Sequence, residues 1–240
     1  MKPGWAALDA EMAAIARGQS SEAQYYWACH RPRFRYLAKL VPTLPLAGPV
    51  LDVGMGFQTL VLDRLLAPRR IDCLGIEEDG RYRPAGDSTF HPADLNDAGL
   101  IRARRPLRPP GYGLVVCMEV IEHLTIPPEL VLPYLAAQLA PGGFLLVTTP
   151  NAAWLKNRLK LLRGQNPFER LSANPAHLGH IREYTQAELA EAFAAARLRR
   201  VRLERRGLYH FRGAKDRLYS LLADVTHASL RRTLIALYRA

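Results

Sequence analysis

The sequence predicts an α/β protein whose mostly parallel sheet is covered by helices on both faces. After Pro49, short apolar runs alternate with helical segments, a pattern typical of parallel strands joined by crossover helices. The length of 240 residues allows one large domain or two small ones, and the Pro/Gly clusters are too short to separate domains. We therefore expect a single domain over residues 1–240.

The expected elements follow one another in a regular order. Apolar runs predict strands over residues 50–53, 71–76, 89–91, 114–118, 144–149, 198–205 and 233–238. Helical periodicity predicts helices over residues 22–40, 59–66, 129–139, 186–196 and 216–225. The first of these helices mixes aromatic and cationic side chains and belongs to an N-terminal helical cap, residues 1–47.

Residues 152–182 form a long insert after the fifth strand. The insert interleaves apolar side chains such as Trp154, Leu159 and Phe168 with the cations Lys156 and Arg163. Such a segment can cover a pocket as a lid, lie on a membrane surface, or form a solvated amphipathic helix. The pattern alone leaves these three interpretations open.

Composition argues against several classes of protein. No stretch reaches the roughly 20 apolar residues that a membrane-spanning helix needs, and Asp9 and Glu11 interrupt the only candidate for a secretory segment. We therefore expect a cytoplasmic protein without a transmembrane segment. Cys29, Cys73 and Cys117 show no C-x-x-C spacing, which argues against a disulfide framework and a thiolate zinc site.

The net charge of +11 is concentrated at the C-terminal end. From Arg197 onward, twelve Lys or Arg stand against three acidic residues. Such a section can face nucleic acid, anionic lipid or an acidic substrate. Arginine outnumbers lysine 28 to 5, however, so a general preference for arginine on solvated faces is an equally simple explanation.

A glycine turn follows the first strand and is the most informative motif. Residues 50–58 read Val-Leu-Asp-Val-Gly-Met-Gly-Phe-Gln, and Gly54 and Gly56 allow the backbone to approach a bound cofactor closely. The third glycine of a dinucleotide fingerprint is absent, which disfavours a nicotinamide enzyme. Glu77 ends the second strand, where a carboxylate can accept both ribose hydroxyls, and Asp94 follows the third strand. Together these residues suit an adenosine.

In this order, the motifs resemble those of class I S-adenosylmethionine-dependent methyltransferases over about residues 48–206. Residues 112–124 are similar to the fourth strand of that family, and residues 139–151 to its Pro-Gly-Gly turn and fifth strand. Within that family, the motifs most resemble those of the O-methyltransferases of ubiquinone biosynthesis and related bacterial enzymes. The resemblance implies a Rossmann-like sheet of seven strands whose last strand is antiparallel.

The resemblance also implies S-adenosyl-L-methionine as cofactor. Asp52, Gly54 and Gly56 would hold its methionine part, Glu77 its ribose, and Asp94 with Leu95 its adenine, while Met118 would complete the cofactor contacts. Structural alternatives stay open, because Asp52 can bond to loop amides alone and Glu77 can simply begin a helix. Gln58 departs from the family pattern at the third position of the turn.

Three side chains after the fourth strand are candidates for catalysis. Glu119, Glu122 and His123 are spaced i, i+3 and i+4, so a helix would place them on one face, where they could bind a proton or a divalent cation. A similar run in the ubiquinone enzymes and in the 2′-O-methyltransferases of small-RNA 3′ ends resembles a metal site with a later histidine, here His180. The resemblance therefore implies either a cation such as Mg²⁺ on these four residues, or catalysis by His123 and Glu122 without a metal. Simple capping of a helix is the structural alternative.

These motifs imply an enzyme that moves a methyl group to a hydroxyl of a small-molecule or glycan acceptor. One alternative is an RNA 2′-O-methyltransferase that uses the basic C-terminal face, although no RNA-reading aromatic motif supports nucleic acid as a partner. Another is a non-catalytic homologue that binds the cofactor. Peripheral membrane contact and the oligomeric state are left open.

Overall fold

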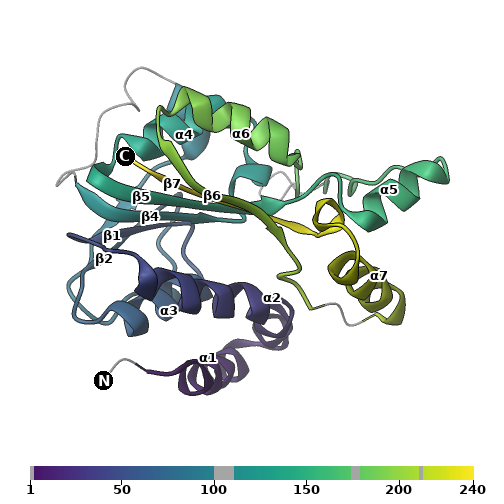
Figure 1. Ribbon diagram of the computed structural model, residues 1–240. Helices are drawn as coiled ribbons and strands as arrows, with labels where there is room; N and C mark the ends of the chain where they lie inside the picture. The colour runs from purple at the N-terminus through teal and green to yellow at the C-terminus, as the bar shows by residue number, and fades with distance from the viewer. Residues whose placement is uncertain (1–2, 100–110, 174–178, 211–212) are drawn as a thin grey trace.

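A seven-stranded sheet forms the centre of the computed structural model, which describes residues 3–99, 111–173, 179–210 and 213–240 (Figure 1). Its strand order is β3-β2-β1-β4-β5-β7-β6. The sheet is parallel except for β7, which runs antiparallel to both of its neighbours. The predicted α/β class, with an antiparallel last strand, is therefore confirmed. The strands are β1 (Val50–Val53), β2 (Ile71–Gly75), β3 (Phe90–Pro92), β4 (Tyr112–Met118), β5 (Leu139–Pro150), β6 (Arg199–Arg206) and β7 (Thr233–Arg239).

Helices cover both faces of the sheet (Figure 1). One face carries α3 (Phe57–Leu66) together with α1 (Trp5–Gln19) and α2 (Ser21–Leu40). The other face carries α4 (Pro128–Ala136) and α6 (Gln186–Ala195). Two further helices, α5 (Leu155–Leu162) and α7 (Ala214–Val225), lie side by side beyond the carboxyl ends of the parallel strands.

The apolar strands are buried on both of their faces, which explains why they read as continuous hydrophobic runs. In β4 every residue is buried. Leu114 and Val116 pack into the core beneath α1, α2 and α3, whereas Val115 and Cys117 pack into the core beneath α4 and α6. Successive side chains of a strand point to opposite faces, so a strand covered by helices on both sides needs apolar residues throughout.

The register of the sheet brings three chain segments together at the carboxyl ends of the parallel strands. Val53 at the end of β1 pairs with Leu74 of β2 and with Cys117 of β4. The residues that follow β1 and β4 therefore leave the sheet next to each other. Open α/β sheets bind ligands at the carboxyl ends of their strands, where neighbouring connections diverge to opposite faces.

The segment ahead of the sheet forms two helices. A helix was expected over residues 22–40, and α2 begins close to that point because the Ser20 hydroxyl accepts a hydrogen bond from the Ala23 amide at 3.0 Å. The helix α1 was not predicted, since Asp9 and Glu11 interrupt its apolar run, yet Leu8, Met12 and Ala16 are buried at helical spacing. None of the helices in the described ranges combines the length and the apolar character that a bilayer crossing requires.

Candidate active site

The glycine turn after β1 has the conformation that its sequence predicts. Gly54 has a φ of 78°, in the left-handed region that favours glycine. A Cβ added there would lie 3.1 Å from a methyl group of Val120. The turn then leads into α3, for which Gly56 is the residue before the first helical position. Gly54 is therefore required both by its backbone angle and by the close approach of the segment that follows β4.

Asp52 lies beneath this turn and is fully buried. Its Oδ2 accepts a hydrogen bond of 2.5 Å from the Thr59 hydroxyl, whose oxygen accepts the Gly56 amide at 2.9 Å. Its Oδ1 accepts no hydrogen bond from any described residue. Burial raises the pKa of Asp52 to about 7, although Thr59 and the nearby Gln58 favour the charged form. One oxygen thus supports the turn, and the other is buried without a hydrogen bond from the described residues.

The buried carboxyl makes stability depend on pH. The pKa of Asp52 is raised on folding, from 3.8 to about 7, so its contribution is complete below pH 4 and is lost as the pH rises through 7. Replacing Asp52 by Asn removes this loss. When the pH rises from 4 to 8, the free energy of unfolding of the Asn variant should increase relative to that of the parent by at least about 1 kcal/mol. Urea unfolding of both proteins at both pH values measures this change. If the difference in free energy of unfolding between the two proteins is the same at both pH values, the pKa of Asp52 is not raised by folding.

Gln58 stands where the family pattern has its third glycine. Its side chain is buried and folds back over the turn, where Nε2 donates a hydrogen bond to the Gly54 carbonyl. A Cβ on Gly56 would lie 2.7 Å from its Oε1. Gln58 therefore fills the space above Gly56 and braces the turn from within.

A cavity of about 430 Å³ opens above the turn. The turn itself contributes Gly54 to Gln58, and Met118, Glu119 and Val120 form the neighbouring wall. The first half of α2 and η2 (Gly80–Tyr82) close the remaining sides. This volume falls within the range of about 300–1,000 Å³ that is typical of small-molecule sites. Three predicted cofactor residues, Gly54, Gly56 and Met118, thus line one cavity.

The other predicted cofactor residues lie differently. Glu77 is exposed, two residues beyond β2. Asp94 is exposed and caps η3 (Leu95–Gly99), because its Oδ1 accepts the Asn96 backbone amide and side-chain amide, both at 2.9 Å. Leu95 is buried in the core beneath α4. None of these three is among the described residues that line the cavity.

Glu119 is held by a buried arginine that the sequence did not single out as a site residue. The spacing of Glu119, Glu122 and His123 suggested a helix, but Glu119 has a φ of 54° and only Ile121–His123 form a short 3₁₀ helix, η5. Its Oε2 lies 3.2 Å from Nη1 of Arg33, and its Oε1 accepts the Thr148 hydroxyl at 2.9 Å. Glu119 is therefore part of the cavity wall and forms an ion pair with Arg33 of α2.

Arg33 links this pair to a second lining residue of the cavity. Its side chain is only 2% exposed, and Nη2 donates to the Tyr26 hydroxyl at 2.9 Å. Tyr26 and Arg33 are seven residues apart on α2, two helical turns, so both point to the same side. This helical spacing was the one sequence signal that could have identified Arg33.

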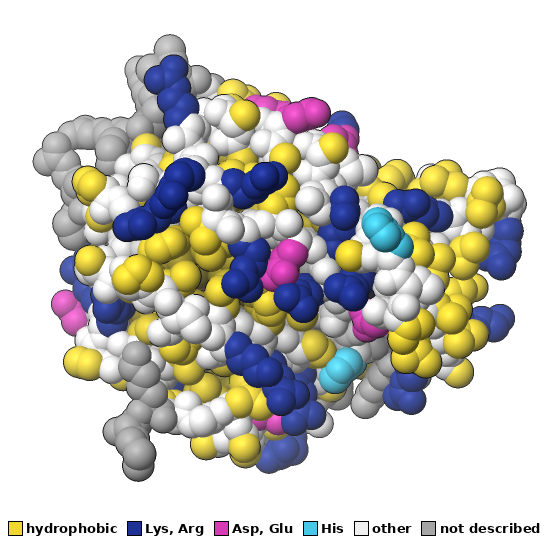
Figure 2. All heavy atoms as spheres, in the orientation of Figure 1, with side chains coloured by type: hydrophobic (Ala, Val, Ile, Leu, Met, Phe, Trp, Pro, Cys, Tyr) yellow, Lys and Arg dark blue, Asp and Glu magenta, His cyan; other side chains and the backbone are white. Residues whose placement is uncertain are grey.

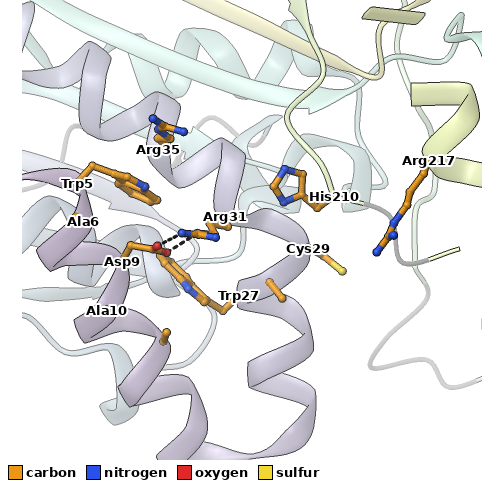
Figure 3. A pocket seen from close by; sticks show the side chains of 12 residues that line it. Trp5, Ala6, Asp9, Ala10, Trp27, Cys29, Arg31, Arg35, His210 and Arg217 are labelled. Atoms are coloured by element: carbon orange, nitrogen blue, oxygen red, sulfur yellow. Dashed lines mark hydrogen bonds and ion pairs between the residues drawn. The ribbon is translucent and has the colours of Figure 1, made fainter. Parts of the chain in front are cut away.

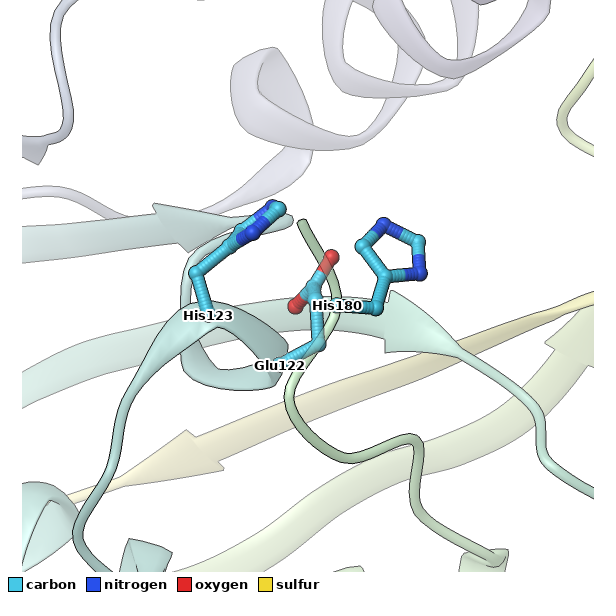
Figure 4. Close-up of side chains that lie close together, drawn as sticks. All are labelled: Glu122, His123 and His180. Atoms are coloured by element: carbon cyan, nitrogen blue, oxygen red, sulfur yellow. The ribbon is translucent and has the colours of Figure 1, made fainter. Parts of the chain in front are cut away.

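The structure brings Glu122, His123 and His180 to one point, three of the four residues for which the resemblance implied a metal site. One ligand atom from each residue lies within 4.8 Å of the others. Figure 4 shows the Glu122 carboxylate between the two imidazole rings, whose centroids are 5.0 Å apart. The Glu122 carbonyl accepts the Ile181 amide at 2.8 Å, and this backbone contact brings His180 to the site. Glu119 is not a member of this group, so the fourth predicted metal ligand is absent from it.

Hydrogen bonds define which histidine nitrogens are free. The Nδ1 of His123 lies 2.9 Å from the Gly179 carbonyl, and that of His180 lies 3.3 Å from Oε1 of Glu183. Carbonyl and carboxylate oxygens only accept, so both Nδ1 atoms carry the proton and both Nε2 atoms are the free positions.

The charges of the group follow from its surroundings. Desolvation lowers the pKa of His123, which is therefore neutral at pH 7. The hydrogen bond to Glu183 raises the pKa of His180. Burial, together with the charge of Glu119, raises the pKa of Glu122 to about 8. Glu122 accepts the Thr149 hydroxyl at 3.0 Å through Oε2, while no described residue bonds to its buried Oε1.

A second cavity, of about 760 Å³, lies between α1, α2 and the start of α7 (Figure 3). It is lined by Trp5 and Trp27 and by several cations, of which Arg31 pairs with Asp9. The two cavities share no lining residue, and none of the predicted site residues lies in this one. Of the predicted site residues, Gly54, Gly56, Met118 and Glu119 line the cavity above the glycine turn, whereas Glu122, His123 and His180 are not among its described lining residues.

The sheet order, the glycine turn and its adjoining cavity define a class I methyltransferase that uses S-adenosylmethionine as methyl donor. A family model described as a methyltransferase domain matches residues 21–202. The chain belongs to this methyltransferase family and is an enzyme. No curated protein matches the sequence.

Solved structures share the fold at low sequence identity. A methyltransferase in complex with the Trm112 methyltransferase activator from Haloferax volcanii has 17% identity and a TM-score of 0.59, covering 97% of this chain and 95% of its own. The 1,6-didemethyltoxoflavin N1-methyltransferase of Burkholderia thailandensis, solved with substrate and S-adenosylhomocysteine, has 17% identity, a TM-score of 0.56 and coverages of 98% and 88%. An S-adenosylmethionine-dependent methyltransferase from Mesorhizobium loti has 14% identity, a TM-score of 0.55 and coverages of 87% and 96%.

Proposed function

We propose that this enzyme methylates a hydroxyl group of a small molecule or glycan. The observation that carries the proposal is the neutral His123, whose Nδ1 is held by the Gly179 carbonyl and whose Nε2 is free. His123 follows the cavity wall formed by Met118 and Glu119. A hydroxyl acceptor must lose its proton during methyl transfer, and a neutral imidazole is suited to take it.

The residues present fit the donor. When bound, S-adenosylmethionine supplies a methyl group on a sulfonium, which is displaced in line and demands chiefly accurate positioning. The turn with Gly54 and Gly56 would hold its methionine part, with Met118 beside them in the cavity lining and Asp52 buried beneath the turn. Glu77 would serve the ribose, and Asp94 with Leu95 the adenine, if the donor extends beyond the cavity, whose described lining includes none of the three.

A divalent cation on Glu122, His123 and His180 is the second reading of the same group. In both histidines Nδ1–H is tied to an oxygen and Nε2 is free, as in many metal-binding histidines. Two imidazoles and one carboxylate suit Mn²⁺, Fe²⁺ or Zn²⁺ better than Mg²⁺, which prefers oxygen ligands. A cation there would polarise the acceptor hydroxyl and lower its pKa.

Calorimetry with S-adenosylhomocysteine, followed by turnover with an acceptor panel, tests the proposal. We expect binding and transfer to hydroxyl acceptors. Transfer to amines alone would show that the acceptor atom is nitrogen and not a hydroxyl oxygen. Binding of S-adenosylhomocysteine without any turnover would favour a non-catalytic homologue. The panel should include amines because the Burkholderia enzyme is an N-methyltransferase.

The glycine turn allows a sharper test of the donor site. Gly54→Ala would place a Cβ at a φ of 78° and 3.1 Å from Val120. The left-handed conformation costs alanine about 1–2 kcal/mol, so we expect the free variant's turn to relax to another conformation and affinity for S-adenosylhomocysteine, which needs the original turn, to fall about tenfold. Gly164→Ala is the matched control, since Gly164 also has a positive φ of 68° but lies outside the cavity lining, with nothing within 4 Å of its added Cβ. Equal affinities of the two variants would place the donor elsewhere.

RNA remains a second candidate acceptor because β6 exposes arginines. Arg199 and Arg200 are exposed, whereas Arg202 and Arg206 share Glu204 at 3.5 and 2.8 Å. Figure 2 shows Lys and Arg side chains distributed over this face. RNA held there would bind with an affinity that falls steeply with salt. Binding that salt does not change would count against this acceptor.

A further inference from the structure

Large apolar side chains stand exposed on the part of the molecule formed by α5, the segment after it and α7. The described residues include twelve exposed large hydrophobic side chains, and eight of them belong to this part. We call these eight the α5–α7 surface: Leu161, Leu162, Phe168, Leu171, Leu218, Leu221, Leu222 and Val225. The exposed fraction reaches 83% at Leu162 and 71% at Val225. Concentrations of exposed apolar residues of this kind mark interaction sites.

The two helices form one platform. Figure 1 shows α5 and α7 side by side, projecting beyond the sheet. The Lys156 ammonium lies 2.8 Å from Oδ1 of Asp216, which ties the start of α5 to the start of α7. In Figure 2 the apolar atoms of this region form a patch with Lys and Arg side chains at its margin.

The charge beside the α5 part of the surface is mostly positive. Residues 155–171 contain five Lys or Arg and one acidic residue, Glu169, a surplus of four. In α7, by contrast, Lys215 and Arg217 are balanced by Asp216 and Asp224. Apolar residues bordered by cations are typical of helices that lie in the interface of a membrane, with long cationic side chains reaching the headgroups.

We propose that the α5–α7 surface docks on an anionic lipid bilayer. Its leucines would enter the boundary between headgroups and acyl chains, while the exposed Arg163 and Arg170 would contact lipid phosphates. A second copy of the chain fits less well, because a symmetric contact would place one surplus of four positive charges against another. This docking goes beyond methyl transfer and does not depend on the acceptor.

Co-sedimentation of the full chain with vesicles tests the proposal. We expect binding to phosphatidylcholine vesicles that contain phosphatidylglycerol, weak binding to phosphatidylcholine alone, and a decrease with salt. Leu162→Glu combined with Leu221→Glu should lower the vesicle partition coefficient roughly tenfold or more. Arg163→Gln with Arg170→Gln removes charge from two exposed side chains and leaves the apolar residues in place, and it should weaken anionic-vesicle binding by about tenfold or more.

Val201→Glu is the matched control, since Val201 is 48% exposed on β6, outside the surface. It makes the same kind of change and should leave vesicle binding intact, and circular dichroism verifies that each variant is folded. Three results would overturn the proposal: equal binding to both vesicle types, unchanged binding of the leucine variant, or a concentration-dependent dimer that this variant abolishes. The last result would assign the surface to a second copy.

Discussion

Replacing Glu119 by Ala is expected to lower the free energy of unfolding by about 3–5 kcal/mol, because the change leaves a buried guanidinium without its counter-charge. Arg33 is 2% exposed and lies 3.2 Å from Glu119. A lone buried charge costs far more than an exposed ion pair contributes. Urea unfolding at pH 7 measures the difference between the variant and the parent.

Two further variants give this expectation its control. Glu78→Ala removes an exposed partner, 3.6 Å from Arg83, and should cost less than about 1 kcal/mol. Arg33→Met added to Glu119→Ala removes the stranded charge and should restore most of the stability. If Glu119→Ala is no more harmful than Glu78→Ala, Arg33 is compensated by other groups and the pair does not stabilise α2 on the sheet.

The sheet was predictable because its signal is local. A strand buried on both faces needs a nearly continuous apolar run, which β4 shows directly, while in Val50–Val53 only the buried Asp52 breaks it. The helix α1 escaped prediction because its apolar residues are interrupted by acids, of which Asp9 is only 14% exposed and pairs with Arg31 of α2. Local pattern therefore predicts elements well but misjudges short amphipathic helices.

The glycine turn was also predictable, since glycine is the residue that most readily adopts the left-handed conformation found at Gly54. The Arg33–Glu119 pair was not, because its two residues are 86 positions apart and meet only when α2 covers the end of β4. Nor could the sequence show that Glu119 itself adopts a φ of 54°, which turns it away from Glu122 and His123. The spacing i, i+3, i+4 suggested one face of a helix that the chain does not form.

His180 shows the opposite case, a distant residue whose position was predicted by resemblance alone. Nothing local requires it to meet Glu122, and the contact depends on the Ile181 and Arg182 amides, which donate to the Glu122 carbonyl at 2.8 and 3.2 Å. Of the predicted lid over residues 152–182, the structure describes residues 152–173, which include α5, and 179–182, and the other five residues lie outside the described ranges.

Replacing His123 by Gln is expected to lower kcat by about 10²–10⁴-fold if His123 removes the acceptor proton. Because the pKa of His123 is lowered from 6.5, the parent should lose activity as its imidazole is protonated, below that pH. The variant lacks this group, so the acidic fall in rate should disappear. Rates measured between pH 5 and pH 9 with a saturating acceptor test both statements. His227→Gln changes an exposed histidine of η6 (Ala228–Leu230) at its cap and should leave kcat unchanged.

Chelation then separates the two readings of the same three side chains. An unaided base keeps full activity after dialysis against EDTA, and His180→Ala then changes kcat much less than His123→Gln does. A metal-dependent enzyme instead loses activity on dialysis and regains it with Mn²⁺ or Zn²⁺, and both histidine variants bind the ion more weakly. Glu122 adds a third measurement, because its Oε1 has no bond to any described residue and its carboxylate is the ligand that Glu122→Gln removes. Restored activity in the parent combined with no change in metal affinity in all three variants would exclude this cluster as the metal site and leave His123 as the base.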